Sequence, residues 1–318
     1  MKLRKLFLVS LLISSVSLAG VSPPKKTTIQ NNTVELDLSY DFFVPGETFR
    51  ISFIVVLPRT IPSRQKILSI KYSPKPSRIF HENGNRYAEF VFIKPDKRMK
   101  VEISIRAELL RYDLLTAREK REQDPSNGPG FKDFLKQEKN IEKYHPQIQQ
   151  IAKNIDGQTE IDVVKNIYNY VIDSLEYTLH GRKDWGAVKA LQQKKGDCSE
   201  YSDLFVTICR AKNIPARVAT GYMVRFDTNS SKHHWAEVYL QKYGWVPFDP
   251  SWGDVQNIIF RNRAFDSMRP AYIYLTYIRN DEVLNNYQFA GYTYWGDRAR
   301  LKDSIKFKQL YPRFQKTH

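Results

Sequence analysis

The sequence predicts an α+β protein, in which an N-terminal antiparallel β-sandwich is followed by a domain of helices packed on an antiparallel sheet. Three observations support this fold class. Apolar and polar residues alternate in short runs between residues 33 and 111, apolar residues recur every three or four positions between residues 161 and 208, and alternation returns after Pro215. Alternation is the period of a half-buried strand, and the longer spacing is that of a helix. Helices followed by antiparallel strands are typical of α+β domains.

Length and composition are those of an ordinary folded protein. The 318 residues exceed a typical domain of ~100–200 residues, so we expect two domains or one large one. Hydrophobic residues make up 42% and charged residues 26% of the chain, which excludes intrinsic disorder, collagen and coiled coil as the main state. Two cysteines are too few for a disulfide scaffold or a cysteine zinc cluster.

Residues 1–20 are typical of a secretory signal peptide. They combine a basic start, a short apolar core and small residues at Ser17 and Ala19, and cleavage is expected after Ala19 or Gly20. A retained anchor is the alternative, although the apolar core is short of the ~20 residues that a spanning helix needs. No later stretch is apolar enough to span a membrane. We therefore expect an exported protein that is periplasmic, at the cell surface or secreted, without stable membrane insertion after signal removal.

Residues 21–122 are expected to form the β-sandwich. Turn formers at Pro45-Gly46 and Asn83-Gly84 separate the alternating runs. The expected strands include residues 34–38, 49–56, 87–92 and 101–105. We find no motif in this part of the chain that carries chemistry.

A polar stretch rich in Pro and Gly, residues 123–131, is interpreted as a linker to a second domain at residues 132–318. Three helices are predicted in this second domain. The first follows the apolar stripe of residues 161–175, the second covers residues 187–196 and ends at a glycine, and the third begins near Cys198. Strands are predicted at residues 216–224, 235–240 and 245–249, and the aromatic tail at residues 271–295 is expected to extend their sheet.

The two cysteines differ in their surroundings. Cys198 and Cys209 are eleven residues apart in one predicted helix, about 16 Å along its axis, which is too far for a disulfide. Cys198 follows Gly196 and Asp197 at the helix start, where free N–H groups and the helix dipole favour a thiolate. Its backbone N–H could also form half of an oxyanion hole. A small buried hydrophobic residue is the alternative for either cysteine, and it suits Cys209 better.

A nucleophilic thiol needs a base, and the base needs an orienting group. His233 and His234 lie on one predicted strand and Asp249 on the next. Side chains alternate along a strand, so only one of the two imidazoles can face the thiol. If the hairpin pairs Leu240 with Gly244, Asp249 shares a face with His233, whereas a bulge would reverse this. A purely structural role for the histidine is the alternative.

Three blocks of sequence extend this pattern over about 55 residues. They are Gly196-Asp197-Cys198-Ser199-Glu200-Tyr201, then residues 210–222, and then His233-His234-Trp235-Ala236-Glu237 with Gly244-Trp245-Val246-Pro247-Phe248-Asp249-Pro250. With these blocks in this order the chain resembles the transglutaminase-like superfamily, which has a papain-like Cys-His-Asp core. The resemblance is to an exported prokaryotic-type member with an N-terminal β domain, and it implies a transglutaminase-like (papain-like) fold for the second domain.

The resemblance implies a catalytic triad. Cys198 would be the nucleophile, His233 the base, because it stands two residues before Trp235, and Asp249 the orienting carboxylate. The implied reaction is thiol-dependent acyl transfer or hydrolysis on peptide or protein amides through a thioester at Cys198. Water as acceptor makes a cysteine protease or amidase, and a lysine amine makes a crosslink. The family contains both kinds, and the motif does not choose between them.

Cofactors and the remaining site residues follow less directly from the resemblance. Animal transglutaminases depend on calcium, but this basic chain shows no Asp-x-Asp-x-Asp loop, so we expect no calcium, no other metal and no cofactor. The side chain that the family adds to the oxyanion hole has no clear match. Tyr177 and Trp185 are candidates, and a role as core aromatic residues is the alternative for both.

The net charge suggests a second partner besides a protein or peptide amide. Lys and Arg total 50 against 34 acidic residues, a formal charge of +16, which signal removal would reduce to +13 by taking away Lys2, Arg4 and Lys5. An anionic cell-wall polymer is one partner for such a surface, and an ordinary solvated basic surface is the alternative. A non-enzymatic cell-surface binding module with a vestigial triad is the rival function. Nucleic-acid binding is disfavoured by export and by the lack of a recognisable motif.

Overall fold

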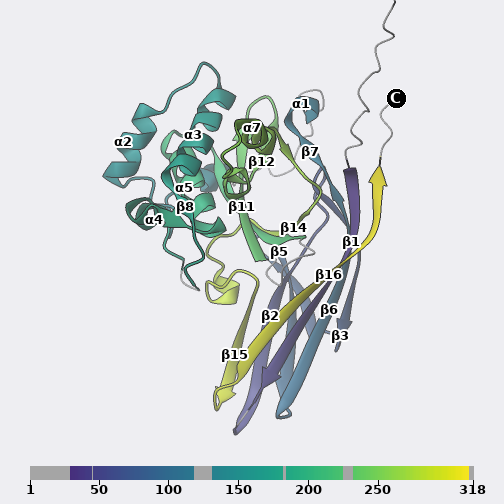
Figure 1. Ribbon diagram of the computed structural model, residues 1–318. Coiled ribbons are helices and arrows are strands. Elements are labelled where there is room, and N and C mark those ends of the chain that lie inside the picture. Colours follow the sequence, from purple (N-terminus) through teal and green to yellow (C-terminus); the bar gives the residue numbers. More distant parts are fainter. Residues whose placement is uncertain (1–28, 45, 118–130, 182–183, 225–231, 315–318) are drawn as a thin grey trace, which may run out of the picture.

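The computed structural model describes residues 29–44, 46–117, 131–181, 184–224 and 232–314. The predicted signal peptide and nearly all of the predicted linker therefore lie outside the described residues. Figure 1 shows a β-sandwich beside a group of helices around a second sheet. The α+β fold class is confirmed. None of the helices in these ranges combines the length and the apolar character needed to cross a membrane.

The sandwich consists of two four-stranded antiparallel sheets with the orders β16-β1-β6-β3 and β15-β2-β5-β4. Its strands from the first part of the chain are β1 (Ile29–Phe43), β2 (Thr48–Leu57), β3 (Gln65–Ser73), β4 (Arg78–Glu82), β5 (Asn85–Ile93) and β6 (Arg98–Leu110). Every second residue of β1 from Val34 to Phe42 is buried, as the alternation predicts. Between the sheets the rings of Tyr40 and Phe53 lie 4.8 Å apart.

The turn between β4 and β5 shows how local sequence fixes the register. Glu82 pairs with Asn85, so the loop has only Asn83 and Gly84. Both residues have positive φ, 50° and 80°, which a two-residue hairpin turn requires and which Asn-Gly adopts readily. The predicted turn is therefore confirmed at this position.

The second domain packs helices against a sheet with the order β12-β11-β10-β14. The sheet contains β10 (Ala216–Met223), β11 (Lys232–Leu240), β12 (Gly244–Phe248) and β14 (Tyr272–Thr276). The helices are α2 (Pro146–Asn154), α3 (Glu160–Ser174), α4 (Ala187–Gln193), α5 (Cys198–Ala211), α6 (Pro250–Gly253) and α7 (Ile258–Asp266). Helix α5 is central: it contacts β10 and β11 as well as α2, α3 and α4, and its residues from Cys198 to Arg210 are all buried.

Smaller elements complete the described chain. They are β7 (Tyr112–Asp113), α1 (Leu114–Ala117), η2 (Phe131–Leu135), β8 (Glu176–Tyr177), β9 (Lys195–Gly196), β13 (Ser267–Met268) and η3 (Glu282–Leu284). Strand β7 pairs with β13, and β8 pairs with β9.

The C-terminal tail corrects one expectation. Strand β14 extends the sheet of the second domain through β10, as expected. The later strands β15 (Ala290–Gly296) and β16 (Arg300–Phe314) pair instead with β2 and β1 of the sandwich. The prediction that the aromatic tail extends the second sheet as far as residue 295 is therefore wrong for β15. Alternation identifies a strand but not its neighbour, and a long strand such as β1 leaves a row of unpaired backbone groups unless another strand covers it.

A buried ionic cluster joins the sandwich to the second sheet. Arg64, just before β3, donates from Nε to Glu237 Oε1 at 3.1 Å and from Nη2 to the Trp245 carbonyl at 2.6 Å. Arg217 on β10 donates to the other Glu237 oxygen at 2.7 Å, and all three ionic side chains are at least 94% buried. Next to them Gln65 makes hydrogen bonds to both backbone polar atoms of Tyr274 on β14.

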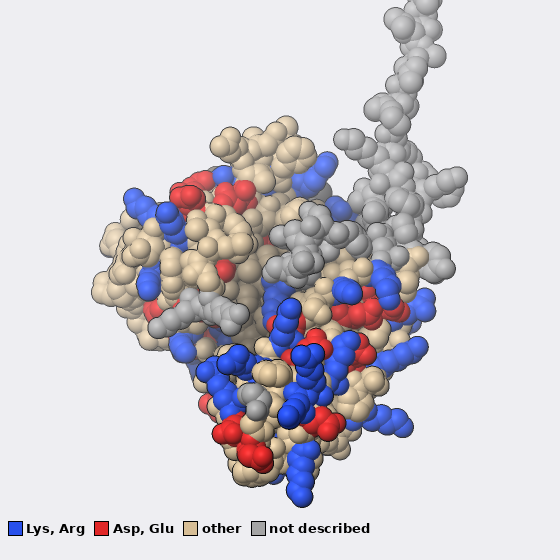
Figure 2. Space-filling model, turned by 60° about the horizontal axis from the view of Figure 1, so that its bottom comes forward, with Lys and Arg blue, Asp and Glu red and all other residues tan. Residues whose placement is uncertain are grey.

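Surface charges are mixed rather than grouped by sign. Figure 2 shows Lys and Arg side chains interspersed with Asp and Glu on the face that it presents. Lys308, for example, lies within 3.3 Å of Glu35 and 3.0 Å of Asp37 on the neighbouring strand. The positive charge of this face is therefore spread over a mixed surface.

We predict that Glu237→Gln strongly destabilises the protein, because it leaves two buried guanidinium groups without a compensating anion. The expected loss is about 3–5 kcal/mol in the free energy of unfolding, measured by urea titration. The control is Glu102→Gln, which removes an exposed partner of Lys100 and should cost under about 1 kcal/mol. Equal effects of the two substitutions would contradict a coupling role for the cluster.

Candidate active site

Cys198 lies at the first position of α5, held there by a capping box. The Asp197 carboxylate accepts a hydrogen bond from the Ser199 N–H at 2.8 Å, and Glu200 Oε2 accepts from the Asp197 N–H at 3.1 Å. Position 196 must be glycine because its backbone lies against the Glu200 side chain. A Cβ atom there would lie 2.4 Å from the Glu200 Cβ. The Gly-Asp-Cys-Ser-Glu sequence thus places the thiol at the N-terminus of a buried helix, as predicted.

The β11–β12 hairpin has the predicted register. Leu240 pairs with Gly244 and Ala236 with Phe248, so residues 233 and 249 fall on the same face. His233 Nε2 lies 2.7 Å from Asp249 Oδ2, and both side chains are about 95% buried. Cys198 is close enough to the same ring to contribute to raising the pKa of His233. The structure thus brings all three predicted residues together, with Nε2 of the ring directed at Asp249.

The neighbouring groups hold a proton on His233. Burial lowers the pKa of His233, but the opposing effects of Asp249 and Cys198 are larger and raise it to about 10. Burial likewise raises the pKa of Asp249, but His233 and hydrogen bonds from Ser251 and Tyr272 outweigh it, and the net pKa is lowered.

His234 points to the opposite face and has the opposite electrostatics. Its Nδ1 lies 2.9 Å from the Thr220 hydroxyl oxygen. Burial lowers its pKa well below the ordinary value, and the positive charges of Arg279 and His233 lower it further. His234 is therefore neutral at physiological pH, and it does not lie between the thiol and Asp249.

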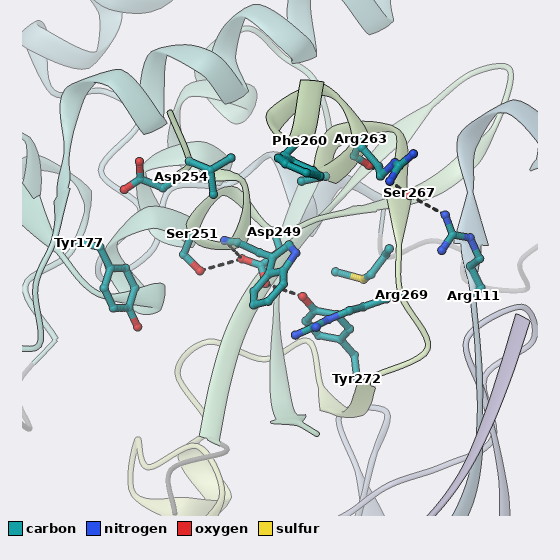
Figure 3. A pocket seen from close by; sticks show the side chains of 14 residues that line it. Arg111, Tyr177, Asp249, Ser251, Asp254, Phe260, Arg263, Ser267, Arg269 and Tyr272 are labelled. Atoms are coloured by element: carbon teal, nitrogen blue, oxygen red, sulfur yellow. Dashed lines mark hydrogen bonds between the residues drawn. The ribbon is translucent and has the colours of Figure 1, made fainter. Parts of the chain in front are cut away.

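Asp249 is held by more groups than the sequence indicates. Tyr272 donates to Oδ2 at 2.8 Å, Ser251 Oγ donates to Oδ1 at 2.7 Å, and the Trp252 N–H donates to Oδ1 at 3.0 Å; Figure 3 shows the two side-chain hydrogen bonds. Asp249 is the N-cap of α6 with Pro250 next to it, so Ser251 and Trp252 could have been found from the capping signal Asp-Pro-Ser. Tyr272 lies 23 residues further on, and no sequence signal connects it to Asp249.

Glu200 organises the other side of the helix start. Its Oε1 accepts from the Trp185 N–H at 2.9 Å, and its Oε2 lies 2.8 Å from His180 Nε2. The His180 ring stacks on Trp185 with centroids 3.7 Å apart. The ligand atoms of His180, Asp197 and Glu200 lie within 4.8 Å of one another, but both carboxylates already accept the backbone N–H groups that fix the helix start. We therefore assign them a structural role.

The two aromatic candidates have different positions. Trp185 is half-buried against His180. Tyr177 is 42% exposed, so the alternative of a core aromatic residue is wrong for it. Tyr177 pairs with Gly196, two residues before the thiol, and it lines a cavity beside Asp249. Cys209 is fully buried in α5, and both cysteines are free, as expected from their spacing.

One part of the chain matches the model of a known family. Residues 149–250 match the family model described as the transglutaminase-like superfamily, so the chain contains a transglutaminase-like domain, as the resemblance of the sequence implied.

Similar proteins add the following. The chain is 33% identical over 75 residues to the uncharacterized protein YebA of Bacillus subtilis (strain 168), a match that covers 20% of this chain and 10% of that protein; the chain thus matches about a tenth of the length of this relative. A crystal structure of a candidate cysteine protease from Cytophaga hutchinsonii superimposes with a TM-score of 0.64 at 18% identity, covering 90% of this chain and 93% of the other. The periplasmic domain of TgpA from Pseudomonas aeruginosa gives a TM-score of 0.37 at 14% identity, over 74% and 94% of the two chains. The Cytophaga structure therefore shares the fold over both the sandwich and the second domain.

We predict a pH-dependent contribution of His233 to stability. Its pKa rises from about 6.5 in the unfolded chain to about 10 in the folded one, so this stabilisation is complete below about pH 6.5 and is lost as the pH rises toward 10. The difference in free energy of unfolding between the wild type and His233→Gln should therefore shrink between pH 7 and pH 9.5 by more than about 1.4 kcal/mol, the value of one pKa unit.

The matched control for this experiment is His234→Gln. Its imidazole is already neutral at pH 7 in the folded chain, so the difference from wild type should stay constant over the same range. A parallel change in both variants would contradict a specific charge on His233.

Proposed function

We propose that the protein catalyses thiol-dependent acyl transfer or hydrolysis on peptide or protein amides, with Cys198 as nucleophile, His233 as base and Asp249 as orienting carboxylate. One observation carries the proposal: the buried His233 ring lies 2.7 Å from the Asp249 carboxylate, and Cys198 is close enough to the same ring to help raise its pKa. A nucleophile, a base and an orienting group in this order are what covalent catalysis requires.

The steps follow from the positions of these groups. His233 holds the proton taken from Cys198, and the thiolate attacks the carbonyl carbon of the amide to form a tetrahedral oxyanion. The backbone N–H of Cys198, in the first turn of α5, is a candidate donor to that oxyanion. The C–N bond then breaks, His233 returns the proton to the leaving amine or ammonia, and a thioester remains on Cys198. Water or a second amine, deprotonated by His233, attacks the thioester and releases the free thiol.

The acceptor determines the kind of enzyme. Water gives a cysteine protease or amidase, and a lysine amine gives a crosslinking enzyme. We propose a protein or peptide as substrate for both reactions. We further propose that the protein acts after export, on the basis of the composition of residues 1–20.

The direct test is alkylation with iodoacetamide between pH 5 and pH 9, with mass spectrometry reporting the two cysteines separately. Cys198 should be labelled rapidly even at the acidic end of this range, because a nucleophile activated by a neighbouring base reacts where an ordinary cysteine does not. Cys209 should remain unlabelled, because burial raises its pKa and it is fully inaccessible. His233→Ala should slow labelling of Cys198 at pH 6 by at least about tenfold, because the base that activates the nucleophile is lost.

The control variant is His234→Gln, which changes the neighbouring imidazole and should leave labelling of Cys198 unchanged. Equal and slow labelling of both cysteines in the wild type would contradict the catalytic proposal. It would favour instead a non-enzymatic binding module that retains the three residues.

We also propose that the basic surface holds the protein on an anionic cell-wall polymer. The formal charge of +13 that remains after signal removal supports long-range attraction, which salt screens with a Debye length of about 8 Å at physiological ionic strength. Retention on cell-wall preparations should fall steeply between 50 mM and 500 mM NaCl, as measured by sedimentation. Retention that does not change with salt would contradict this partner.

A further inference from the structure

A cavity of about 610 Å³ lies beside Asp249. On one side it reaches Tyr177, which pairs with the residue two positions before Cys198, and on the other it reaches Tyr272, which holds Asp249. Figure 3 shows its side chains gathered around Asp249 from α6, α7 and the segments on either side of β13. The cavity therefore adjoins the groups that would carry out the reaction, but its own lining has no part in that chemistry except through Asp249.

Three arginines line this cavity: Arg111, Arg263 and Arg269, and Figure 3 shows them on the side away from Tyr177 and Asp254. Arg263 is exposed, and among the described residues its guanidinium has no hydrogen bond or ion pair. The Nε of Arg269 is buried and finds no hydrogen-bond acceptor within the described ranges. Arg111 already has two partners: it donates a hydrogen bond to Ser267 at 2.9 Å and lies 3.9 Å from Asp113.

The two carboxylates of the same cavity already have other partners. Asp249 interacts with His233, Tyr272 and Ser251, as described above. Asp254 Oδ2 accepts a hydrogen bond from Tyr201 at 2.7 Å. The lining therefore has an excess of positive charge. Among the described residues the Arg263 guanidinium and the Nε of Arg269 have no acceptor, and Nη2 of Arg269 has only a weak one, Met223 Sδ at 3.6 Å.

The arginine side is built against an apolar wall. The Arg269 guanidinium lies 3.7 Å from the centroid of the Trp252 ring, and this stacking fixes its plane and leaves its edge for a ligand. Trp252, Val255 and Phe260 are 42%, 37% and 57% exposed, which is unusual for large apolar side chains close together on a surface. A ligand that matches this lining has a carboxylate next to an apolar group.

We propose that this cavity is a specificity pocket, in which Arg263 and Arg269 bind a carboxylate of the amide substrate while Trp252 and Phe260 contact an adjacent apolar side chain. The inference rests on the proposed function, because it takes the substrate of Cys198 to be a peptide or protein amide. The carboxylate is either that of an Asp or Glu side chain or the C-terminus of a peptide, since both present the same two oxygens to a guanidinium.

The test measures binding to the Cys198→Ala variant, so that no turnover is needed. The probes are fluorescein-labelled, C-terminally amidated hexapeptides of Ala, Leu and one Gln, in which Glu, Gln or Lys is placed in turn at each position around the Gln. A further arm uses the neutral peptide with a free C-terminal carboxylate. Fluorescence anisotropy gives the affinities. We expect one position, or the free C-terminus, to bind about tenfold more tightly when it carries a carboxylate.

Arginine variants show whether this preference comes from the cavity. Arg263→Gln and Arg269→Gln, each in the Cys198→Ala background, should reduce the preference for a carboxylate at least about threefold. Arg106→Gln is the matched control, an exposed arginine on β6 of the sandwich, and it should leave the preference unchanged. Because Arg263 is exposed and unpaired within the described chain, its replacement tests the inference even if Arg269→Gln impairs folding.

The outcomes separate this inference from the proposed function. Equal affinities for the Glu, Gln and Lys peptides, no binding of any peptide, or a preference that survives both arginine substitutions would overturn the specificity pocket. Alkylation of Cys198 that still depends on His233 would then leave the catalytic proposal standing. Conversely, a carboxylate preference that the arginine variants abolish supports the pocket even if Cys198 proves unreactive.

Discussion

The need to compensate buried charges on strand β11 constrains the arrangement of the whole protein. This strand is paired on both sides, and it carries His233 and Glu237 into the interior, where an unpaired charge costs several kcal/mol. Their partners come from three other segments: Arg64 from the sandwich, Arg217 from β10 and Asp249 from the end of β12. The same strand therefore fixes the interface between the domains at one end and the candidate active site at the other.

The sandwich also supports the site through β14. Gln65 makes hydrogen bonds to both backbone polar atoms of Tyr274, and two residues earlier on the same strand Tyr272 holds the Asp249 carboxylate. The chain then continues from β14 into β15, which pairs with β2 of the sandwich. The sandwich thus holds β14 in two ways. The Gln65 side chain binds its backbone, and the next strand of the chain, β15, is part of the sandwich. This linkage gives a physical reason why the two parts recur together in the Cytophaga structure, which matches 90% of this chain.

The features that could be predicted from the sequence are those that depend on residues close together in the chain. The alignment of His233 with Asp249 follows from a tight turn at Gly244, whose φ is 72°, and from the two-residue period of strands. The position of Cys198 follows from a capping box that lies within four residues. By contrast, the partners of β15 and β16, the contact of Arg64 with Glu237 and that of Tyr272 with Asp249 join distant segments. A strand has the same alternation of residues whichever sheet edge it pairs with, and an arginine or tyrosine is the same residue whichever partner it finds. The sequence alone therefore could not identify these partners.

The adjacent histidines show how far environment, rather than residue type, sets a role. His233 and His234 share a strand and are both almost fully buried, and burial alone would lower the pKa of each. His233 faces a carboxylate and a thiol, which reverse that effect. His234 faces the Thr220 hydroxyl and the field of Arg279, and Arg279 itself is held by a bidentate contact with buried Asp203 at 2.7 and 2.9 Å. Since the Cβ direction alternates along β11, a shift of one residue in the hairpin register would exchange the two environments. The charge on the candidate base therefore depends on the turn at Gly244 as much as on the identity of the base.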